Sequence, residues 1–467
     1  HFNVQMSVTR IHEDPRVTKP YTDEQWSAIN AAGYHIDSDL RTADVRLTMG
    51  GEPTFVSVDD MNGAEWKTQA LGSNKRRLAG DLLARLKNRF APGGLLHMGQ
   101  GKWYPGEPLP RWALRCYWRL DGEPMWNDES LFADPTKTGN HTVDDARRFG
   151  RLLAEKLSVL PQYVIDGYED TLYYAWKERR LPANVDARNS RLENEEERAR
   201  LARLFEQGIT SPVGCVLPLR RVWWDAQPRW ESGEWVVRSN ELFLIPGDSP
   251  MGFRLPMQSL LWHKRSELET AGYTRDAFAD RPELPLYHQL CERTARQATS
   301  IVTQFRPAAI GAARQGEIAY SVDEGDRGES AYHEENGDSS YAIGANGDGP
   351  VTHLQNGRDT PANSASPVAH DPAGVVRTAL CIEPRDGVLH VFLPPIDHLE
   401  DYLELLAAIE TTAAELSTPV VIEGYEPPHD HRISHVKVTP DPGVIEVNVP
   451  PAHDWDELAS ITTGVYE

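Results

Sequence analysis

Residues 435–451 read His-Val-Lys-Val-Thr-Pro-Asp-Pro-Gly-Val-Ile-Glu-Val-Asn-Val-Pro-Pro, and this stretch decides how the fold is interpreted. Polar and apolar residues alternate on both sides of Pro-Asp-Pro-Gly, which is typical of two antiparallel strands joined by a turn. His435 and Lys437 share one face of the first strand, and Glu446 and Asn448 share one face of the second. A four-residue loop at 439–442 sets His435 opposite Glu446 and makes the polar faces coincide, whereas a five-residue loop separates them. The pattern fits a face that holds a metal and an anion, and it equally fits a solvent-facing hairpin.

The rest of the chain predicts an α+β fold rich in antiparallel strands, because strands and helices do not alternate regularly. Thr142 is the expected N-cap of one helix, and Phe149 and Leu153 are expected to face inward from it. The expected helices span residues 74–90, 142–157, 194–207 and 396–416. The expected strands span residues 45–49, 113–120, 214–217, 234–238, 241–245, 378–383, 388–393, 420–423, 434–438 and 444–449.

Charge is unevenly distributed along the 467 residues, whose net charge is -22. A balance this acidic argues against nucleic-acid partners and against an anionic membrane surface, and no apolar run approaches the ~20 residues of a membrane helix. Residues 316–372 hold 11 acidic residues and 2 arginines among Gly, Ser and Asn. We expect this stretch to be a flexible insertion. It separates an N-terminal region, residues 1–315, with the first motif and Trp-rich insertions, from a truncated C-terminal part of the same domain, residues 373–467.

The chain begins with His1 and ends at Glu467 inside a helical pattern, so we interpret it as a piece of a longer polypeptide. Its four cysteines are far apart in sequence, and no pair has metal-ligand or redox spacing. Reduced thiols and a cytoplasmic location are expected. No cysteine lies in a known catalytic signature, and neither a Gly-x-Ser-x-Gly elbow nor a Rossmann fingerprint is present.

The first candidate site residue is Glu52, in Leu-Thr-Met-Gly-Gly-Glu-Pro-Thr-Phe at residues 47–55. A short strand ends in two glycines, which let a ligand approach the backbone closely. A carboxylate presented in this way suits Mg²⁺. The alternative is a turn with a solvated glutamate.

A second candidate is the run from 423 to 432, which is dense in titratable groups and follows an expected strand. Its Glu426 could accept a proton, and Arg432 could clamp a phosphate or a carboxylate. Two histidines with a carboxylate could bind a metal, although their spacing matches no zinc pattern. A solvated loop explains the same composition.

Two further stretches could contact a polyanion. Gln100 and Lys102 lie in Gly-Gln-Gly-Lys-Trp-Tyr-Pro-Gly-Glu at 99–107, which is not a Walker A loop. Arg254 follows Ile-Pro-Gly-Asp-Ser-Pro-Met-Gly-Phe at 245–253. Plain structural turns are the alternative for both.

Four stretches together resemble a bacterial amidoligase family of the glutamine-synthetase-like carboxylate–amine ligase group. They lie at residues 46–57, 99–107, 245–256 and 440–451, so the resemblance covers nearly the whole chain except the acidic insertion. The resemblance implies an antiparallel sheet with a polar concave face and helices behind it. It also implies that Glu52 and Glu446 hold Mg²⁺ around ATP, with Asn448 beside them. Members carry a transglutaminase-like cysteine-protease domain upstream and a further segment downstream, so we expect missing flanks here.

The resemblance implies an ATP- and Mg²⁺-dependent ligase that joins a carboxylate to an amine through an acyl phosphate. Small-molecule or peptide carboxylates and amines are the expected substrates. Lys102, Arg254, Arg432 or Lys437 would hold phosphate or the substrate carboxylate, with Gln100 and Asn448 also near the nucleotide. His435 or Glu426 would accept the proton of the amine. Two alternatives remain: a non-catalytic peptide-binding module that serves the fused domain, and peptidase or transglutaminase activity located in that domain.

Overall fold

The computed structural model describes residues 21–107, 109–181, 184–224, 227–237, 241–260, 281–304 and 376–467. The described residues before 305 and after 375 belong to a single compact unit. The expected insertion at 316–372 lies outside the described residues.

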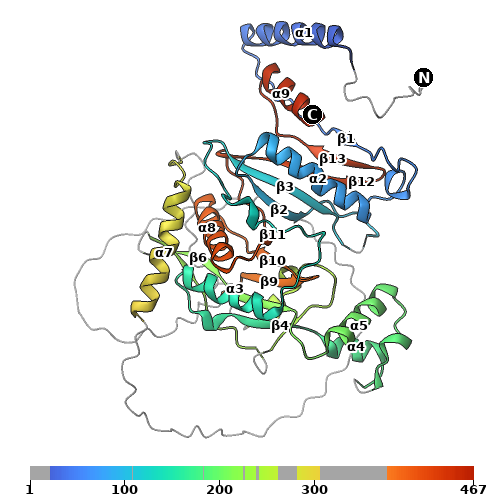
Figure 1. Cartoon of the computed structure of the whole chain (residues 1–467), viewed down its shortest axis with the longest axis vertical. Coiled ribbons are helices and arrows are strands. Elements are labelled where there is room, and N and C mark those ends of the chain that lie inside the picture. Colours follow the sequence, from blue (N-terminus) through green and yellow to red (C-terminus); the bar gives the residue numbers. More distant parts are fainter. Residues whose placement is uncertain are drawn as a thin grey trace, which may run out of the picture. The chain divides into compact units, whose positions relative to one another are not determined.

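A mixed sheet of eleven strands forms the centre of this unit (Figure 1). Its spatial order is β1-β13-β12-β3-β2-β11-β10-β9-β5-β4-β8. Neighbours are antiparallel except for β2 with β11, β11 with β10, and β4 with β8. The strands are β1 (Thr54–Phe55), β2 (Leu95–Gln100), β3 (Trp112–Arg119), β4 (Ile165–Glu169), β5 (Gly214–Pro218), β8 (Leu242–Leu244), β9 (Ala379–Arg385), β10 (Val388–Leu393), β11 (Val420–Gly424), β12 (Ile433–Asp441) and β13 (Val444–Asn448). A separate hairpin pairs β6 (Arg220–Trp224) with β7 (Gln227–Glu231).

The four predicted helices are confirmed. Thr142 caps its helix by accepting a hydrogen bond from the Asp145 amide, and the Asp145 carboxylate accepts one from the Thr142 amide in return. Phe149 and Leu153 are fully buried, as expected. The helices with bounds in the described ranges are α1 (Asp23–Thr42), α2 (Ser73–Phe90), α3 (Val143–Lys156), α4 (Thr171–Glu178), α5 (Glu195–Gln207), α7 (Tyr287–Gln304), α8 (Leu399–Leu416) and α9 (Trp455–Tyr466). None of them is long and apolar enough to cross a membrane.

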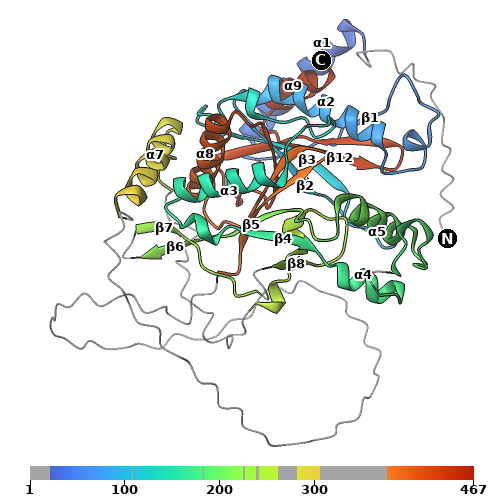
Figure 2. The same cartoon turned by 60° about the horizontal axis from the view of Figure 1, so that its bottom comes forward.

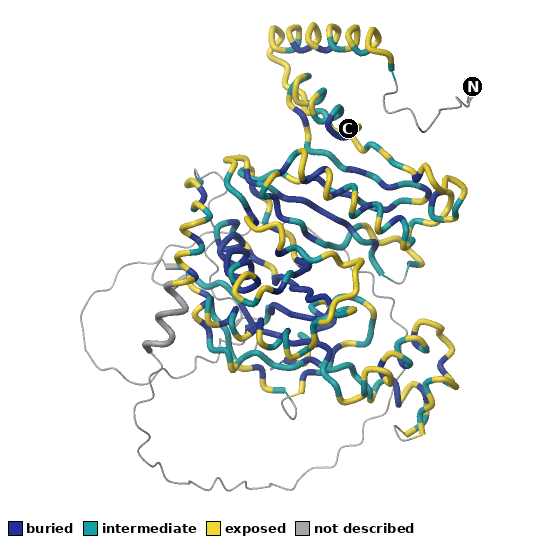
Figure 3. The backbone as a smooth tube through the Cα atoms, viewed as in Figure 1, coloured by how far each residue is buried: buried dark blue, intermediate teal, exposed yellow. Residues whose placement is uncertain are grey.

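Two layers of helices cover opposite faces of the sheet. Leu96 and Met98 of β2 belong to the apolar cluster under α2, which packs on β12 and β3. Leu95 and Tyr117 point the other way and belong to the core formed with α3 and α8. Helices α3 and α8 lie side by side (Figure 2), and α8 is buried along nearly its whole length (Figure 3). The part of this second face over β3, β12 and β13 carries polar side chains.

Three expectations about the strands are corrected. Residues 45–49 form no strand, and Met49 makes only an isolated bridge to Ala452. Residues 234–237 are also without strand structure, because the strand of that region ends at Glu231. The loop of the β12–β13 hairpin has two residues, Pro442 and Gly443, instead of four.

The shorter loop changes the register of the hairpin. Thr439 pairs with Glu446 and Lys437 pairs with Asn448, so His435 does not face Glu446. Gly443 adopts a φ of +79°, which a Pro-Gly turn requires at its second position. Relative to the four-residue loop, the partner of Glu446 moves by four residues, from His435 to Thr439. An even shift leaves side-chain parity unchanged, so the polar faces of both strands coincide, as the four-residue alternative predicted.

The four cysteines are free, and Cys116, Cys215 and Cys381 are buried inside strands. Burial raises the pKa of the Cys116 and Cys215 thiols to about 12. These thiols are therefore protonated and unreactive at neutral pH.

Candidate active site

Polar side chains from five chain segments form one row across the sheet. The backbone at 51–53 runs beside β13: the Val447 amide donates to the Pro53 carbonyl (2.9 Å) and the Val449 amide to the Gly51 carbonyl (3.3 Å). This pairing sets Glu52 beside Asn448. Register partners point their side chains to the same face. The row continues from Asn448 to Lys437, from Lys437 to Arg115 and from Arg115 to His97.

A second row lies next to the first. Glu446 pairs with Thr439, whose hydroxyl donates to the Glu446 carboxylate at 3.5 Å. Gly99 and Ala113, which pair on β2 and β3, have almost no side chain. A Cβ atom at Gly99 would lie 2.1 Å from Arg115 Nη1. The absence of a side chain at Gly99 therefore leaves space for the Arg115 guanidinium.

Arg115 is a buried cation of this polar face. Its side chain is only 8% exposed, and Nη2 lies 2.7 Å from the Glu426 carboxylate and 3.2 Å from the Gln100 carbonyl oxygen. The Tyr117 hydroxyl donates to the other oxygen of Glu426 at 2.7 Å. Burial, followed by the Glu426 charge, raises the pKa of Tyr117, which therefore stays protonated. Glu426 itself is 45% exposed, so Arg115 holds a carboxylate that solvent can reach.

Lys437 lies among the charged groups of the same face, near Arg115. Burial, and next the Arg115 charge, lowers the pKa of Lys437; Glu426, Lys102 and Glu52 are its other electrostatic neighbours. Lys437 makes no hydrogen bond or ion pair to the described part of the chain. Its ammonium group thus lies among charged groups with its donors available to a ligand.

Two histidines border the same face. The His435 ring centroid lies 5.3 Å from that of Tyr117, and desolvation together with Arg115 lowers the pKa of His435. Burial lowers the pKa of His97 to about 3. Both imidazoles are therefore neutral at pH 7, and the more exposed His435 can accept a proton.

The loop that carries Lys102 is fixed to the hairpin by Arg111. Arg111 forms ion pairs with Glu107 (2.8 Å) and Asp441 (2.7 Å), and its guanidinium lies 4.1 Å from the centroid of the Tyr104 ring. The fully buried Lys75 reaches the same turn and donates to the Asp441 carbonyl at 2.9 Å. These contacts hold the Lys102 loop and the β12–β13 turn in fixed relation to each other.

A family model described as "Putative amidoligase enzyme (DUF2126)" matches residues 1–467. The chain belongs to this amidoligase family. A search of curated proteins found no match, and a search of solved structures found none either. The description of the family indicates ligation of a carboxylate to an amine.

The structure brings together seven of the ten residues that the sequence proposed for an amidoligase site. They share the face around Lys437 and are Glu52, Lys102, Glu426, His435, Lys437, Glu446 and Asn448. The pairing that joins the first motif to β13 does not come from a strand at 45–49. It comes from residues 51–55, where Thr54 opposes Glu446.

The other three residues lie elsewhere. Arg254 forms a bidentate ion pair with Glu169 at 2.8 and 2.9 Å, and β4 is seven positions from β12 in the sheet. Arg432 is held by Asp430 (2.7 Å) and Glu400 (3.0 Å), so it ties its loop to α8. Gln100 pairs with Trp112 on the α2 face, and only its backbone carbonyl contacts Arg115.

Sequence reasoning missed Arg115, Tyr117 and His97. The signal that could have found Arg115 and Tyr117 is strand parity, because both residues alternate with the apolar Leu114 and Cys116 within β3. An arginine on one face of an otherwise apolar strand needs a partner, because a buried charge is unstable alone.

The carboxylates of Glu52 and Glu446 are the groups of this face that could hold a divalent cation. Among the described residues, no group of three or more His, Cys, Asp or Glu side chains is arranged to hold a metal ion. Glu52 and Glu446 are diagonal neighbours across the pairing of 51–55 with β13. Two carboxylates fit Mg²⁺, which is commonly held by one or two carboxylates together with phosphate oxygens.

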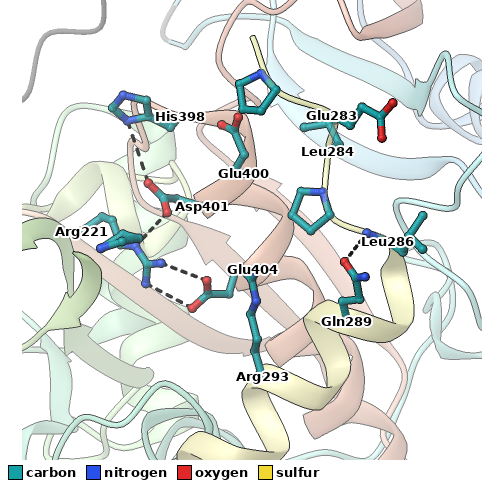
Figure 4. Close-up of a pocket in the computed structure, with 13 residues that line it drawn as sticks. Arg221, Glu283, Leu284, Leu286, Gln289, Arg293, His398, Glu400, Asp401 and Glu404 are labelled. Atoms are coloured by element: carbon teal, nitrogen blue, oxygen red, sulfur yellow. Dashed lines mark hydrogen bonds and ion pairs between the residues drawn. The ribbon is translucent and has the colours of Figure 1, made fainter. Parts of the chain in front are cut away.

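A separate hollow of about 510 Å³ lies between the 282–286 segment and α8 (Figure 4). Arg221 projects from β6 and forms ion pairs with Asp401 (2.8 Å) and Glu404 (2.9 Å). Trp230 donates to the same Glu404 at 3.0 Å. The charges on this wall bind one another and join the β6–β7 hairpin to α8, so we do not place the amidoligase site there.

Proposed function

We propose that the polar face is the active site of an ATP- and Mg²⁺-dependent amidoligase that joins a carboxylate to an amine through an acyl phosphate. The observation that carries the proposal is the row Glu52, Asn448, Lys437 and Arg115, in which carboxylates and cations lie on one face. Such a row provides groups for both a metal–nucleotide and an anionic substrate. A glutamine-synthetase-like fold belongs to the same proposal.

Anion binding is assigned to Arg115, Lys437 and Lys102. Arg115 already holds one carboxylate, and its planar guanidinium suits carboxylate and phosphate geometry. Lys437 supplies a mobile ammonium beside it. Together they orient the substrate carboxylate and stabilise the charge on the phosphoryl oxygens during transfer.

Glu52 and Glu446 would hold the metal. When bound, Mg²⁺ neutralises charge on the nucleotide phosphates. Asn448 lies between the two carboxylates and can donate its amide hydrogens to a phosphate oxygen.

Proton removal from the attacking amine is assigned to His435, with Glu426 as the alternative. His435 is neutral at pH 7 because its pKa is lowered, so its ring nitrogen can accept a proton. Both carboxylate oxygens of Glu426 are already engaged, one by Arg115 and the other by Tyr117. We further propose a transglutaminase-like domain in the complete polypeptide, peptide or small-molecule substrates and, because all four thiols are free, a cytoplasmic setting.

The test measures ADP and amide formation by the full-length protein with ATP, Mg²⁺ and a panel of carboxylates and amines. Glu52→Gln, Glu446→Gln and Arg115→Met are each expected to lower turnover by at least 100-fold with little change in the thermal midpoint. The exposed Glu206→Gln and Arg85→Met are the matched controls. Full activity in Glu52→Gln and Glu446→Gln would overturn the metal assignment.

A second candidate function follows from the missing third metal ligand among the described residues. In it the polar face binds an acidic peptide through Arg115 and Lys437, and the fused domain carries out the chemistry. Binding of an acidic peptide without any binding of Mg²⁺–ATP to the intact protein would favour this function.

A further inference from the structure

A cavity of about 300 Å³ lies under α2, on the face of the sheet opposite to the proposed active site. Leu83, Leu96, Met98 and Val421 contribute apolar lining, and residues 132–136 close one side. The volume is at the lower end of the range of small-molecule sites. It therefore accommodates a compact ligand with an apolar body.

Part of the cavity exists because residue 80 of α2 has no side chain. Gly80 lies in the interior of α2, where glycine is less favourable than alanine. A Cβ atom there would meet no other atom within 4 Å, so close packing does not explain the glycine. Gly80 lines the cavity together with Ala84, one turn further along the helix. The two small residues leave the α2 wall open.

Arg76 supplies a charge to the same cavity. Its Nη1 is shielded from solvent and makes no hydrogen bond within the described ranges, and its guanidinium lies 4.8 Å from the centroid of the Trp112 ring. Burial, and next the charge of Arg385, lowers the pKa of Arg76 to about 10, while Glu423 acts in the opposite direction. Glu423 is already engaged in an ion pair with Arg385. Arg76 thus brings a cation to the cavity wall, and one of its donors has no partner among the described residues.

We propose that this cavity binds a small amphiphilic carboxylate. The Arg76 guanidinium binds the carboxylate, and the apolar chain lies along Gly80 and Ala84 between α2 and β2. A buried donor without a partner is unfavourable, and an anionic ligand beside the guanidinium offsets that cost. The two sites lie on opposite faces of the sheet, and His97, at the end of the polar row, is the residue of that row that also lines the cavity.

The experiment titrates the full chain with sodium octanoate and, separately, with 1-octanol, by calorimetry. Octanoate is expected to bind at least tenfold more tightly than octanol. Arg76→Met is expected to remove this preference and leave octanol binding unchanged. Gly80→Leu, which fills the cavity, is expected to abolish binding of both.

The controls are Arg85→Met and Asn88→Leu, which change exposed positions of the same helix that do not line the cavity. Both are expected to bind octanoate like the unaltered chain, and so is Glu52→Gln, which tests independence from the ligase site. No octanoate binding by the unaltered chain overturns the proposal. Unchanged octanoate binding in a folded Gly80→Leu variant overturns it as well.

Discussion

Replacing Arg221 with methionine tests the energetics of the contact between β6 and α8. The Arg221, Asp401 and Glu404 side chains are 8%, 5% and 4% exposed, and the guanidinium makes hydrogen bonds of 2.8, 3.1 and 2.9 Å to the two carboxylates. Asp401 and Glu404 are one turn apart on α8. Without Arg221, two like charges stay buried together, and breaking a buried pair in this way costs about 3–5 kcal/mol.

The loss of folding stability in Arg221→Met should depend on pH. Burial already raises the pKa of Asp401 in the folded state, and Arg221 opposes that rise. In Arg221→Met the folded-state pKa rises further above the unfolded value of about 3.9, so the folded state binds more protons than the unfolded state in the interval between them. Stability of the variant therefore falls as pH rises through that interval. The deficit relative to the unaltered chain is largest at pH 8 and shrinks toward pH 5.

Urea denaturation followed by circular dichroism at pH 8 and pH 5 measures both effects. Arg220→Met is the matched control, because Arg220 is the adjacent residue and its partner Glu231 is 32% exposed. A partly exposed pair of this kind contributes at most about 1 kcal/mol. A loss below 1 kcal/mol for Arg221→Met at pH 8, or an equal loss at both pH values, would refute the reasoning.

Three further predictions concern local features. Gly99→Ala places a Cβ 2.1 Å from Arg115 Nη1 and should lower ligase turnover at least tenfold, while the thermal midpoint shifts by less than about 3 °C. Gly233→Ala, at a position with space for a Cβ, should leave turnover unchanged. Equal turnover in the two variants would contradict the role of Arg115. Thr142→Ala removes the cap of α3 and should lower the free energy of unfolding by about 1 kcal/mol in denaturant titrations, while no loss would show that the cap is unimportant. The buried strand cysteines should react with a thiol reagent only after unfolding, whereas the half-buried Cys291 should react earlier in a mass-spectrometric time course; the reverse order would contradict the burial assignment.

The sequence predicted the parts of the fold that depend on local periodicity and capping. Helix α3 starts where Thr142 predicts, and the polar faces of β12 and β13 coincide because an even register shift preserves parity. The exact register was not predictable from the hydrophobic pattern. It depends on a two-residue turn at Pro442 and Gly443, which Lys75 and Arg111 fix from distant parts of the chain.

The candidate site was predicted only in part, because contacts between distant parts of the chain are not visible in local composition. Glu52 and Glu446 are recognisable from their motifs, but Arg115, the buried cation of the same face, lies two strands from β13 in a strand whose apolar residues conceal it. Arg254 and Arg432 were assigned to the site because a loop arginine suits an anion. The structure instead gives each an acidic neighbour, Glu169 for Arg254 and Asp430 for Arg432. Local composition does not reveal whether an arginine already has an intramolecular partner.

The sheet order also constrains how the protein is made on the ribosome. Strands β2 and β3 pair with each other, but their outer neighbours β11 and β12 begin about 300 residues after β3 ends. At about 5–20 residues per second, the nascent β2–β3 hairpin waits roughly 15–60 s with both edges unpaired. Unpaired edges recruit other strands, so this interval is when the chain is most exposed to aggregation. Slowing synthesis between β3 and β11 should therefore reduce the yield of soluble protein more than the same delay placed after β13.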